Sequence, residues 1–186
     1  MSKEPQPASG MMRNPQNAIS SSTRMANFSP TTRIGKESKR LFPDLEAQDI
    51  VDTYETFENG GSLTILAERT NKGLSSRSNW DVYKKEKEMS RILAEDGHNV
   101  VLRESSKAGE TYDITIDGIA ADLKWVTSPK FMKAHAEKAT TKQGAAMTVF
   151  MIDGKWKRFR GMVHDLSSTG YHGLYIRKNT GVVYTY

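Results

Sequence analysis

The chain has 186 residues, a length that suits one compact domain with a tail, and 37% of its residues are hydrophobic. It contains no cysteine, which excludes disulfides and thiolate metal sites. No apolar run approaches the roughly 20 residues of a membrane span and the N-terminus lacks the apolar core of a secretory signal, so we expect no membrane partner.

Residues 1–40 carry the basic excess of the chain. They hold 7 Lys and Arg against 2 Glu, whereas residues 41–186 hold 20 charges of each sign, so the net charge of +5 belongs to this segment. The segment is rich in Ser, Pro, Asn and Met without a sustained apolar period, which predicts a disordered basic tail. Such a tail is either solvated or an arm that contacts phosphates or an acidic partner.

Residues 41–79 are predicted to form a helical extension and a linker. Asp44 is placed to cap a helix that runs to about Phe57, and Asn59-Gly60-Gly61 would end that helix. Leu63–Arg69 fits no single element. Residues 70–79, rich in Gly, Ser and Asn, indicate a linker.

Residues 80–186 show the patterning of an α/β domain. The expected helices cover about 81–95, ending at Gly97, and 128–142, starting at Ser128-Pro129. The expected strands cover 100–102, 112–116, 119–126, 146–152, 156–163, 174–176 and 182–186, with a loop over 104–110. This order predicts an α+β fold, a small mixed sheet with helices on its faces.

A hairpin at Asp117-Gly118 makes a geometric prediction. A two-residue loop pairs Ile116 with Ile119, and continuing that register places Asp113 opposite Asp122. Because side chains alternate, Asp113, Asp122 and Lys124 leave one face of the hairpin. The other face is predicted to be core and carries Tyr112, Ile114, Ile116, Ile119, Ala121, Leu123 and Trp125.

Two carboxylates directly across a strand pair repel each other. The pair becomes stable if a divalent cation lies between the carboxylates, if one is protonated, or if Lys124 neutralises them, and all three are arrangements of active sites. Carboxylate oxygens suit Mg²⁺ or Mn²⁺ as the cation. The alternative is a solvent-facing strand pair with a surface salt bridge.

The helix before the hairpin offers further groups to the same cleft. Glu86 shares a predicted apolar stripe with Val82, Met89 and Leu93, where an acidic side chain is unusual unless it has a partner. The hairpin site would be that partner, while the alternative is an exposed helical Glu. Gln143, at the end of the second predicted helix, is a weaker candidate.

Three segments carry a resemblance to known nucleases. They are the helix with Glu86, Ser90 and Gly97-His98, the strand Tyr112-Asp113-Ile114, and the strand Asp122-Leu123-Lys124. Together they resemble the PD-(D/E)xK nuclease superfamily. They also resemble the C-terminal tRNase domains of contact-dependent inhibition toxins and related phage-borne nucleases of the barnase–EndoU–colicin–RelE-like group, to which Lys142-Gln143-Gly144-Ala145 is similar. The resemblance covers about residues 82–153, and Tyr112 replaces the usual Pro.

The resemblance implies a nuclease with Glu86, Asp113, Asp122 and Lys124 as catalytic residues. The three carboxylates would bind Mg²⁺ or Mn²⁺, and Lys124 would orient the nucleophile or stabilise the transition state. Many members of the second group are thought to act without metal, and for that mechanism His164 and Tyr184 would be the acid and base.

A basic cluster predicts contact with nucleic acid. Lys155, Lys157, Arg158 and Arg160 surround Trp156 and Phe159, so these residues would track a phosphate backbone beside an aromatic side chain. The alternative is an edge strand kept soluble by its charge.

The sequence therefore predicts a nuclease acting on RNA, with tRNA as the sharpest hypothesis, or on DNA. It would be a toxin or a phage or mobile-element effector with a cognate inhibitor protein as a further partner, located in the cytoplasm, delivered to a cell or associated with a virion. The alternatives are a non-catalytic nucleic-acid-binding or phage structural protein with a decayed nuclease fold, and a DNA-processing endonuclease of recombination or repair.

Overall fold

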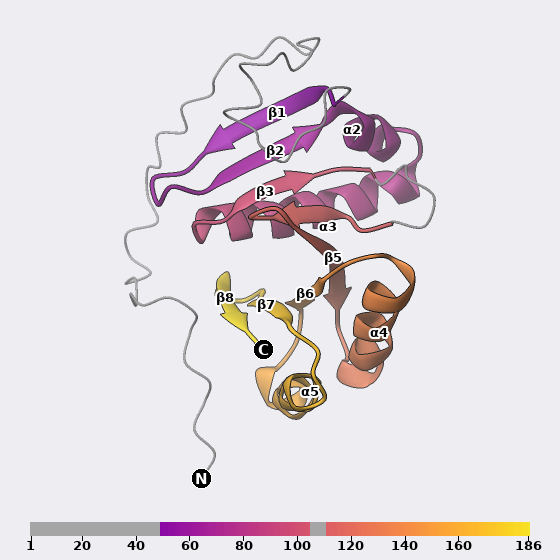
Figure 1. Cartoon of the computed structure of the whole chain (residues 1–186), viewed down its shortest axis with the longest axis vertical. Coiled ribbons are helices and arrows are strands. Elements are labelled where there is room, and N and C mark those ends of the chain that lie inside the picture. The colour runs from indigo at the N-terminus through magenta and orange to yellow at the C-terminus, as the bar shows by residue number, and fades with distance from the viewer. Residues whose placement is uncertain (1–48, 105–110) are drawn as a thin grey trace.

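The computed structural model describes residues 49–104 and 111–186, which form one eight-stranded mixed sheet with its helices (Figure 1). The tail predicted over 1–40 lies outside these residues. No helix among the described residues has the length and apolar character to cross a membrane. The predicted α+β class, a mixed sheet with helices on its faces, is confirmed.

The strands lie in the sheet in the order in which they occur along the chain. They are β1 (Val51–Thr56), β2 (Ser62–Leu66), β3 (Asn99–Leu102), β4 (Ile114–Ile116), β5 (Ile119–Val126), β6 (Met147–Ile152), β7 (Gly173–Arg177) and β8 (Val182–Thr185). The helices are α2 (Ala67–Leu74), α3 (Arg77–Glu95), α4 (Met132–Lys142) and α5 (Trp156–Ser168), and a 3-10 turn, η2 (Pro129–Phe131), precedes α4. The pairs β2/β3, β5/β6 and β6/β7 are parallel, and the other neighbours are antiparallel.

Alternation along the strands creates a core on each face of the sheet. In β6, Val149 and Met151 join the core under α3, whereas Phe150 and Ile152 join the core with α4 and α5. Both sides of β6 are therefore buried, which explains its almost uninterrupted apolar sequence. The hairpin also packs on the α3 side of the sheet. Four residues of its predicted core face lie in that core, namely Ile114, Ile116, Ala121 and Leu123.

The predicted Asp117-Gly118 turn is confirmed. Ile116 pairs with Ile119 and Ile114 with Ala121, as a two-residue loop requires. Both turn residues have positive φ, 50° for Asp117 and 81° for Gly118, as in the mirror-image turns that suit hairpins. Two predicted helix boundaries are confirmed as well. Gly97, also with positive φ, follows the end of α3, and Ser128 caps the turn before α4, where its hydroxyl accepts a hydrogen bond from the Lys130 amide.

The helix predicted from Asp44 to Phe57 is wrong where the structure describes it. Residues 51–56 form β1, which pairs antiparallel with β2. The apolar spacing fits a helical stripe, but the segment is rich in Val, Thr and Tyr, which favour a strand when a partner strand lies beside them.

The linker predicted over 70–79 is also wrong. This segment contains the end of α2 and the start of α3, with the Ser76 side chain capping α3 by accepting a hydrogen bond from the Asn79 amide. Gly73 does not end the helix but lies buried within α2. A Cβ at that position would lie 2.8 Å from the Tyr83 ring of α3. Its missing side chain lets α2 pack closely against α3.

The strand predicted over 156–163 is wrong as well, since these residues begin α5. Phe159, Val163 and Leu166 are the buried residues of α5, and their spacing of three to four places them on one helical face. The basic residues Lys157, Arg158 and Arg160 lie on the exposed face of the helix.

The turn between β1 and β2 gives a test of close packing. An alanine Cβ at Gly61 would lie 2.0 Å from the Ala94 carbonyl oxygen, and the backbone of α3 cannot easily move away. We expect Gly61→Ala to lower the free energy of unfolding by about 2–4 kcal/mol, measured by urea denaturation. Gly60→Ala is the matched control, because Gly60 has open space and only a positive φ of 87°, so its expected loss is about 1 kcal/mol. Equal losses would contradict the packing argument.

Candidate active site

Lys124 joins the two hairpin carboxylates. Its Nζ lies 2.5 Å from Asp122 Oδ2 and 3.9 Å from Asp113 Oδ2. The Asp122 side chain is completely buried and also accepts a hydrogen bond of 3.1 Å from the Gln143 amide. The three predicted hairpin residues are therefore brought together, and the predicted approach of Gln143 is confirmed.

The register at Asp113 differs from the simple prediction. The strand ladder ends at Ile114, and the Asp113 amide donates to the Ala121 carbonyl instead of pairing with Asp122. The Asp113 carboxylate turns back onto β5, where it accepts a hydrogen bond of 2.9 Å from the Leu123 amide. A side chain at the frayed end of a strand is free to rotate, so the two carboxyls meet without a direct cross-strand pair.

Burial and charge shift the titration of Asp113. Its pKa is raised to about 7, first by burial and then by the charge of Asp122, with the hydrogen bond between the two carboxyls acting in the same direction. Lys124 opposes the shift. Of the three ways in which the carboxylate pair could be stabilised, the distances support neutralisation by Lys124, and the raised pKa of Asp113 supports protonation of one carboxyl.

Glu86 is buried as predicted, with 8% of its surface exposed, but for a different reason. Val82 is 49% exposed, so the predicted stripe through Val82 is wrong, and the buried face of α3 runs through Tyr83, Glu86 and Met89. The partner of Glu86 is Arg69, whose Nε donates to Glu86 Oε2 at 2.9 Å. Burial, followed by the charge of Asp113, raises the pKa of Glu86 to about 7, while Arg69 opposes the shift.

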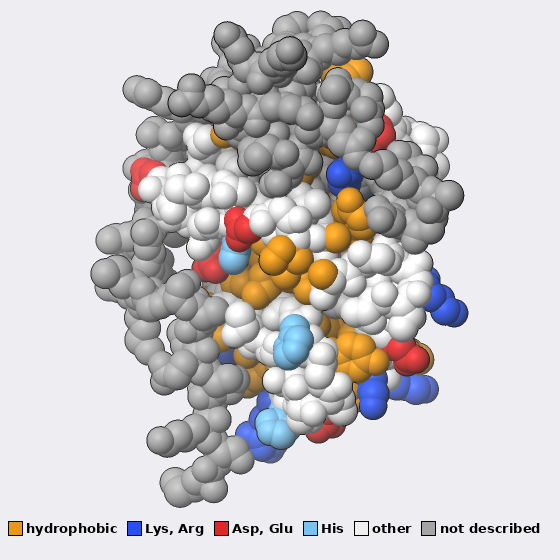
Figure 2. Space-filling model, in the orientation of Figure 1, with side chains coloured by type: hydrophobic (Ala, Val, Ile, Leu, Met, Phe, Trp, Pro, Cys, Tyr) orange, Lys and Arg blue, Asp and Glu red, His pale blue; other side chains and the backbone are white. Residues whose placement is uncertain are grey.

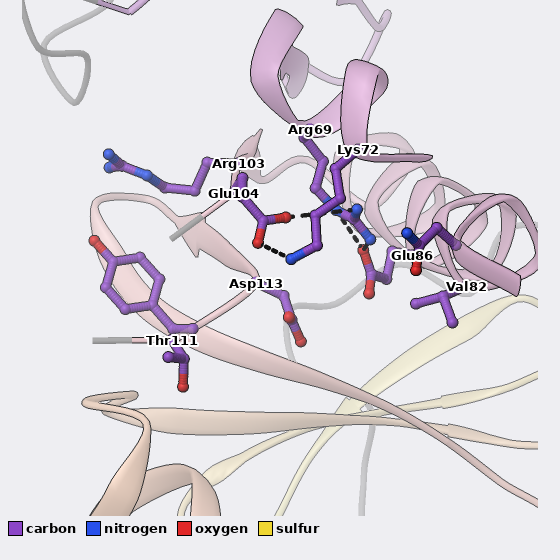
Figure 3. Close-up of a pocket in the computed structure, with 10 residues that line it drawn as sticks. Arg69, Lys72, Val82, Glu86, Arg103, Glu104, Thr111 and Asp113 are labelled. Carbon is purple, nitrogen blue, oxygen red and sulfur yellow. Dashed lines mark hydrogen bonds and ion pairs between the residues drawn. The ribbon is translucent and has the colours of Figure 1, made fainter. Parts of the chain in front are cut away.

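Arg69 belongs to a row of ion pairs that the sequence pattern did not predict. Arg69 contacts Glu86 and also lies 3.6 Å from Glu104, which in turn binds Lys72 (Figure 3). Arg69 and Lys72 come from α2 and Glu104 follows β3. The only sequence signal for this row would be the spacing of Arg69 and Lys72 on one face of a helix, and it is lost when residues 70–79 are assigned to a linker.

A pocket of about 260 Å³ opens between this row and the hairpin (Figure 3). Glu86 and Asp113 both line it, so one buried and one half-buried carboxylate border a space that a ligand can enter. The other residues of its wall are Arg69, Lys72, Asn79, Val82, Arg103, Glu104, Thr111 and Tyr112. Tyr112, predicted to lie in the core, faces this pocket instead because the strand has already ended.

The donor set suits the expected cation in its chemistry. Carboxylate oxygens are the ligands that Mg²⁺ and Mn²⁺ prefer, and Glu86 and Asp113 share a pocket with Asp122 behind them. In the described ranges, no group of three or more His, Cys, Asp or Glu side chains has metal-holding geometry. Arg69 and Lys124 instead provide the positive charge beside these carboxylates.

The basic cluster lies on α5 and not on a strand. Lys155, Lys157, Arg158 and Arg160 are exposed around the first turns of that helix, and Figure 2 shows Lys and Arg side chains at the lower end of the molecule, where α5 lies. The two aromatic residues of the cluster pack within the protein. Phe159 is fully buried, and Trp156 stacks on Tyr175 at 5.1 Å with Arg177 against its ring.

The residues named for a metal-free mechanism do not line the pocket. His164 is exposed on α5, 4.0 Å from Asp165. The Tyr184 ring stacks on Tyr175 at 4.9 Å. Neither contacts Asp113 or Lys124 among the interactions of the described residues.

The buried pair of Arg69 and Glu86 allows a stability prediction. Arg69→Met leaves Glu86 buried without its cation, so we expect a loss of about 2–4 kcal/mol in the free energy of unfolding at pH 8. Without Arg69 the pKa of Glu86 rises further, so at pH 5.5 the group is protonated and the loss is smaller. Urea denaturation at both pH values measures this. Lys72→Met, at an exposed site, should cost less than about 1 kcal/mol, and an equal loss would contradict the role of the buried pair.

Comparison with known proteins gives one weak structural likeness. No family model matches the sequence, and no curated protein matches it. The chain resembles the CdiA-CT/CdiI toxin and immunity complex from Burkholderia pseudomallei with a TM-score of 0.48 and 17% identity, over 61% of this chain and 89% of that chain. A likeness of this size supports no conclusion about activity or partners.

Proposed function

We propose that this protein is a nuclease that hydrolyses phosphodiester bonds in RNA or DNA, with tRNA as the sharpest candidate. The observation that carries the proposal is the meeting of Lys124 with the fully buried Asp122 and the half-buried Asp113 beside a pocket that Glu86 also lines. A fully buried acid and a half-buried acid around one ammonium group are costly to fold, and such costs are typical of sites that do chemistry.

Each group has a role that follows from its surroundings. The Lys124 ammonium would offset negative charge that develops on the phosphate during attack. Asp113 and Glu86, with pKa values of about 7, would accept or donate a proton near neutral pH. Gln143 would orient Asp122 through its amide, and Arg69 would orient Glu86.

Mg²⁺ or Mn²⁺ belongs to the proposal as a cofactor, with Glu86, Asp113 and Asp122 as the residues that would hold it. A bound divalent ion lowers the pKa of a water ligand and neutralises phosphate charge. Lys155, Lys157, Arg158 and Arg160 would bind the nucleic-acid backbone at some distance along the substrate, as exposed cations do.

The biological setting follows from the sequence resemblance and is part of the same proposal. A toxin or mobile-element effector of this kind would act in the cytoplasm of a target cell, or travel with a virion, and a cognate inhibitor would protect the producing cell. The alternatives are a nucleic-acid-binding protein with an inactive site and a DNA-processing endonuclease.

The test is incubation of the purified protein with tRNA and with duplex DNA, each with Mg²⁺ and with EDTA. Cleavage of tRNA alone, lost in EDTA, is the expected result. Cleavage of duplex DNA alone would favour the endonuclease alternative. Binding without cleavage of either substrate would favour the inactive site, and cleavage that persists in EDTA would remove the metal from the proposal.

A further inference from the structure

The pocket beside Glu86 and Asp113 has a wall that the proposed chemistry does not use. Thr111 and Tyr112 precede β4, Arg103 follows β3, and Asn79 comes from the first turn of α3. The guanidinium carbon of Arg103 lies 5.8 Å from the centre of the Tyr112 ring. This wall combines an aromatic ring, a cation, an amide and a hydroxyl, which are the groups that proteins use to bind a nucleobase.

The size of the pocket limits what it can hold. At about 260 Å³ it is smaller than the roughly 300–1,000 Å³ of pockets that enclose drug-sized ligands. One nucleotide-sized group suits this volume, whereas a segment of duplex does not. A base inside a duplex also has no free face for the Tyr112 ring, because its neighbours stack on both sides.

The charged residues of the pocket would suit a nucleotide, whose base is joined to a phosphate. Arg103 lies next to Glu104, which pairs with Lys72, and Glu86 lies on α3 beside Arg69, whereas Asp113 lies at the start of the hairpin (Figure 3). Lys72 and Arg103 line the pocket themselves, so they would contact the phosphate of the nucleotide whose base enters it, a contact that positions the backbone without reading its sequence.

We propose that this pocket receives one unpaired nucleobase next to the scissile phosphate, with Tyr112 against the face of the base and Asn79 and Thr111 at its edge. The proposal rests on the proposed nuclease function and specifies its substrate class. The substrate is a nucleic acid with an unpaired nucleotide at the cleavage site, such as a loop, a bulge or an end, and not a continuous duplex.

The test measures binding and cleavage separately on matched stem-loop and duplex oligonucleotides, made as RNA and as DNA. Binding is measured in EDTA by the fluorescence of 2-aminopurine placed in the loop or at the same position in the duplex. We expect the wild-type protein to bind the loop about tenfold more tightly, since one base stacked on an aromatic ring contributes that much. Tyr112→Leu should abolish the difference, and Tyr171→Leu, outside the pocket, should retain it.

Cleavage is measured on loops in which one nucleotide at a time is replaced by an abasic residue. An abasic residue at one position of the loop should slow cleavage by the wild-type protein about tenfold. The Tyr112→Leu variant should cleave the intact and the abasic loops at the same reduced rate. Equal binding of loop and duplex, or unchanged sensitivity to the abasic residue in Tyr112→Leu, would overturn the pocket assignment. Preferential loop binding without any cleavage would instead leave the pocket standing and refute the nuclease.

Discussion

Replacing Lys124 with methionine is expected to reduce nucleic-acid cleavage at least about 100-fold while the protein stays folded. Methionine fills a similar volume without charge, so the change removes the ammonium group that lies 2.5 Å from Asp122 and 3.9 Å from Asp113. Burial and the charge of Asp122 already raise the pKa of Asp113 to about 7, so this carboxyl can take up a proton in place of the lost cation. Cleavage of tRNA under single-turnover conditions gives the rate, and circular dichroism and thermal unfolding report the fold.

The controls separate chemistry from electrostatic attraction. Lys133→Met removes the same charge from an exposed position on α4 and should cleave at close to the wild-type rate. Lys124→Arg keeps the charge but spreads it over a planar group that does not fit the same position, so we expect only partial activity. A Lys124→Met variant that is folded and cleaves within about threefold of wild type would refute the proposed role.

Much of the hairpin site could be predicted because it depends on local rules. Asp117-Gly118 fixes a two-residue turn, and the turn fixes the parity that sends Asp122 and Lys124 to one face. The prediction failed at Asp113 and Tyr112, where the ladder ends and the alternation no longer fixes the direction of the side chain, and at Ile119, which is exposed beside the turn. Strand ends depend on neighbouring elements that a local pattern does not contain.

The other half of the site depends on contacts between distant segments. Arg69 and Glu86 are 17 residues apart, and their meeting requires α2 to pack on α3. That packing depends on Gly73. A glycine in the sequence suggests the end of a helix, but this one is buried against the Tyr83 ring. In the same way, Val51–Thr56 reads as part of a helix until β2 is beside it, and Trp156–Val163 reads as a strand until its buried side is known. Tertiary packing overrides local preference in each case.

Asp113→Asn is expected to abolish cleavage and, in EDTA, to stabilise the folded protein at pH 8. The substitution removes a half-buried charge that repels Asp122, and the asparagine oxygen can still accept the hydrogen bond of the Leu123 amide. Lys124 retains Asp122 as its partner. A residue that lowers stability but is needed for activity is typical of a functional site, and its replacement gains on the order of 1–2 kcal/mol.

The raised pKa of Asp113 determines how the free energy of unfolding changes with pH. The pKa of Asp113 is about 7 in the folded protein against an ordinary value of 3.8, so between about pH 4 and pH 7 the folded state holds a proton that the unfolded state has released. Wild-type stability should therefore fall as the pH rises through this range. Asp113→Asn removes that titration and also lowers the pKa of Glu86, which the Asp113 charge raises, so its stability should change less with pH.

Urea denaturation in EDTA from pH 4.5 to pH 8 tests the argument, with Asp165→Asn as the control at an exposed acid on α5. The two variants should diverge, because Asp165→Asn should follow the wild-type curve while Asp113→Asn gains on wild type steadily as the pH rises. A constant offset between Asp113→Asn and wild type would mean that Asp113 is already ionised at low pH. The pair with Asp122 would then be held by Lys124 alone, and the shared proton would have no part in stabilising the site.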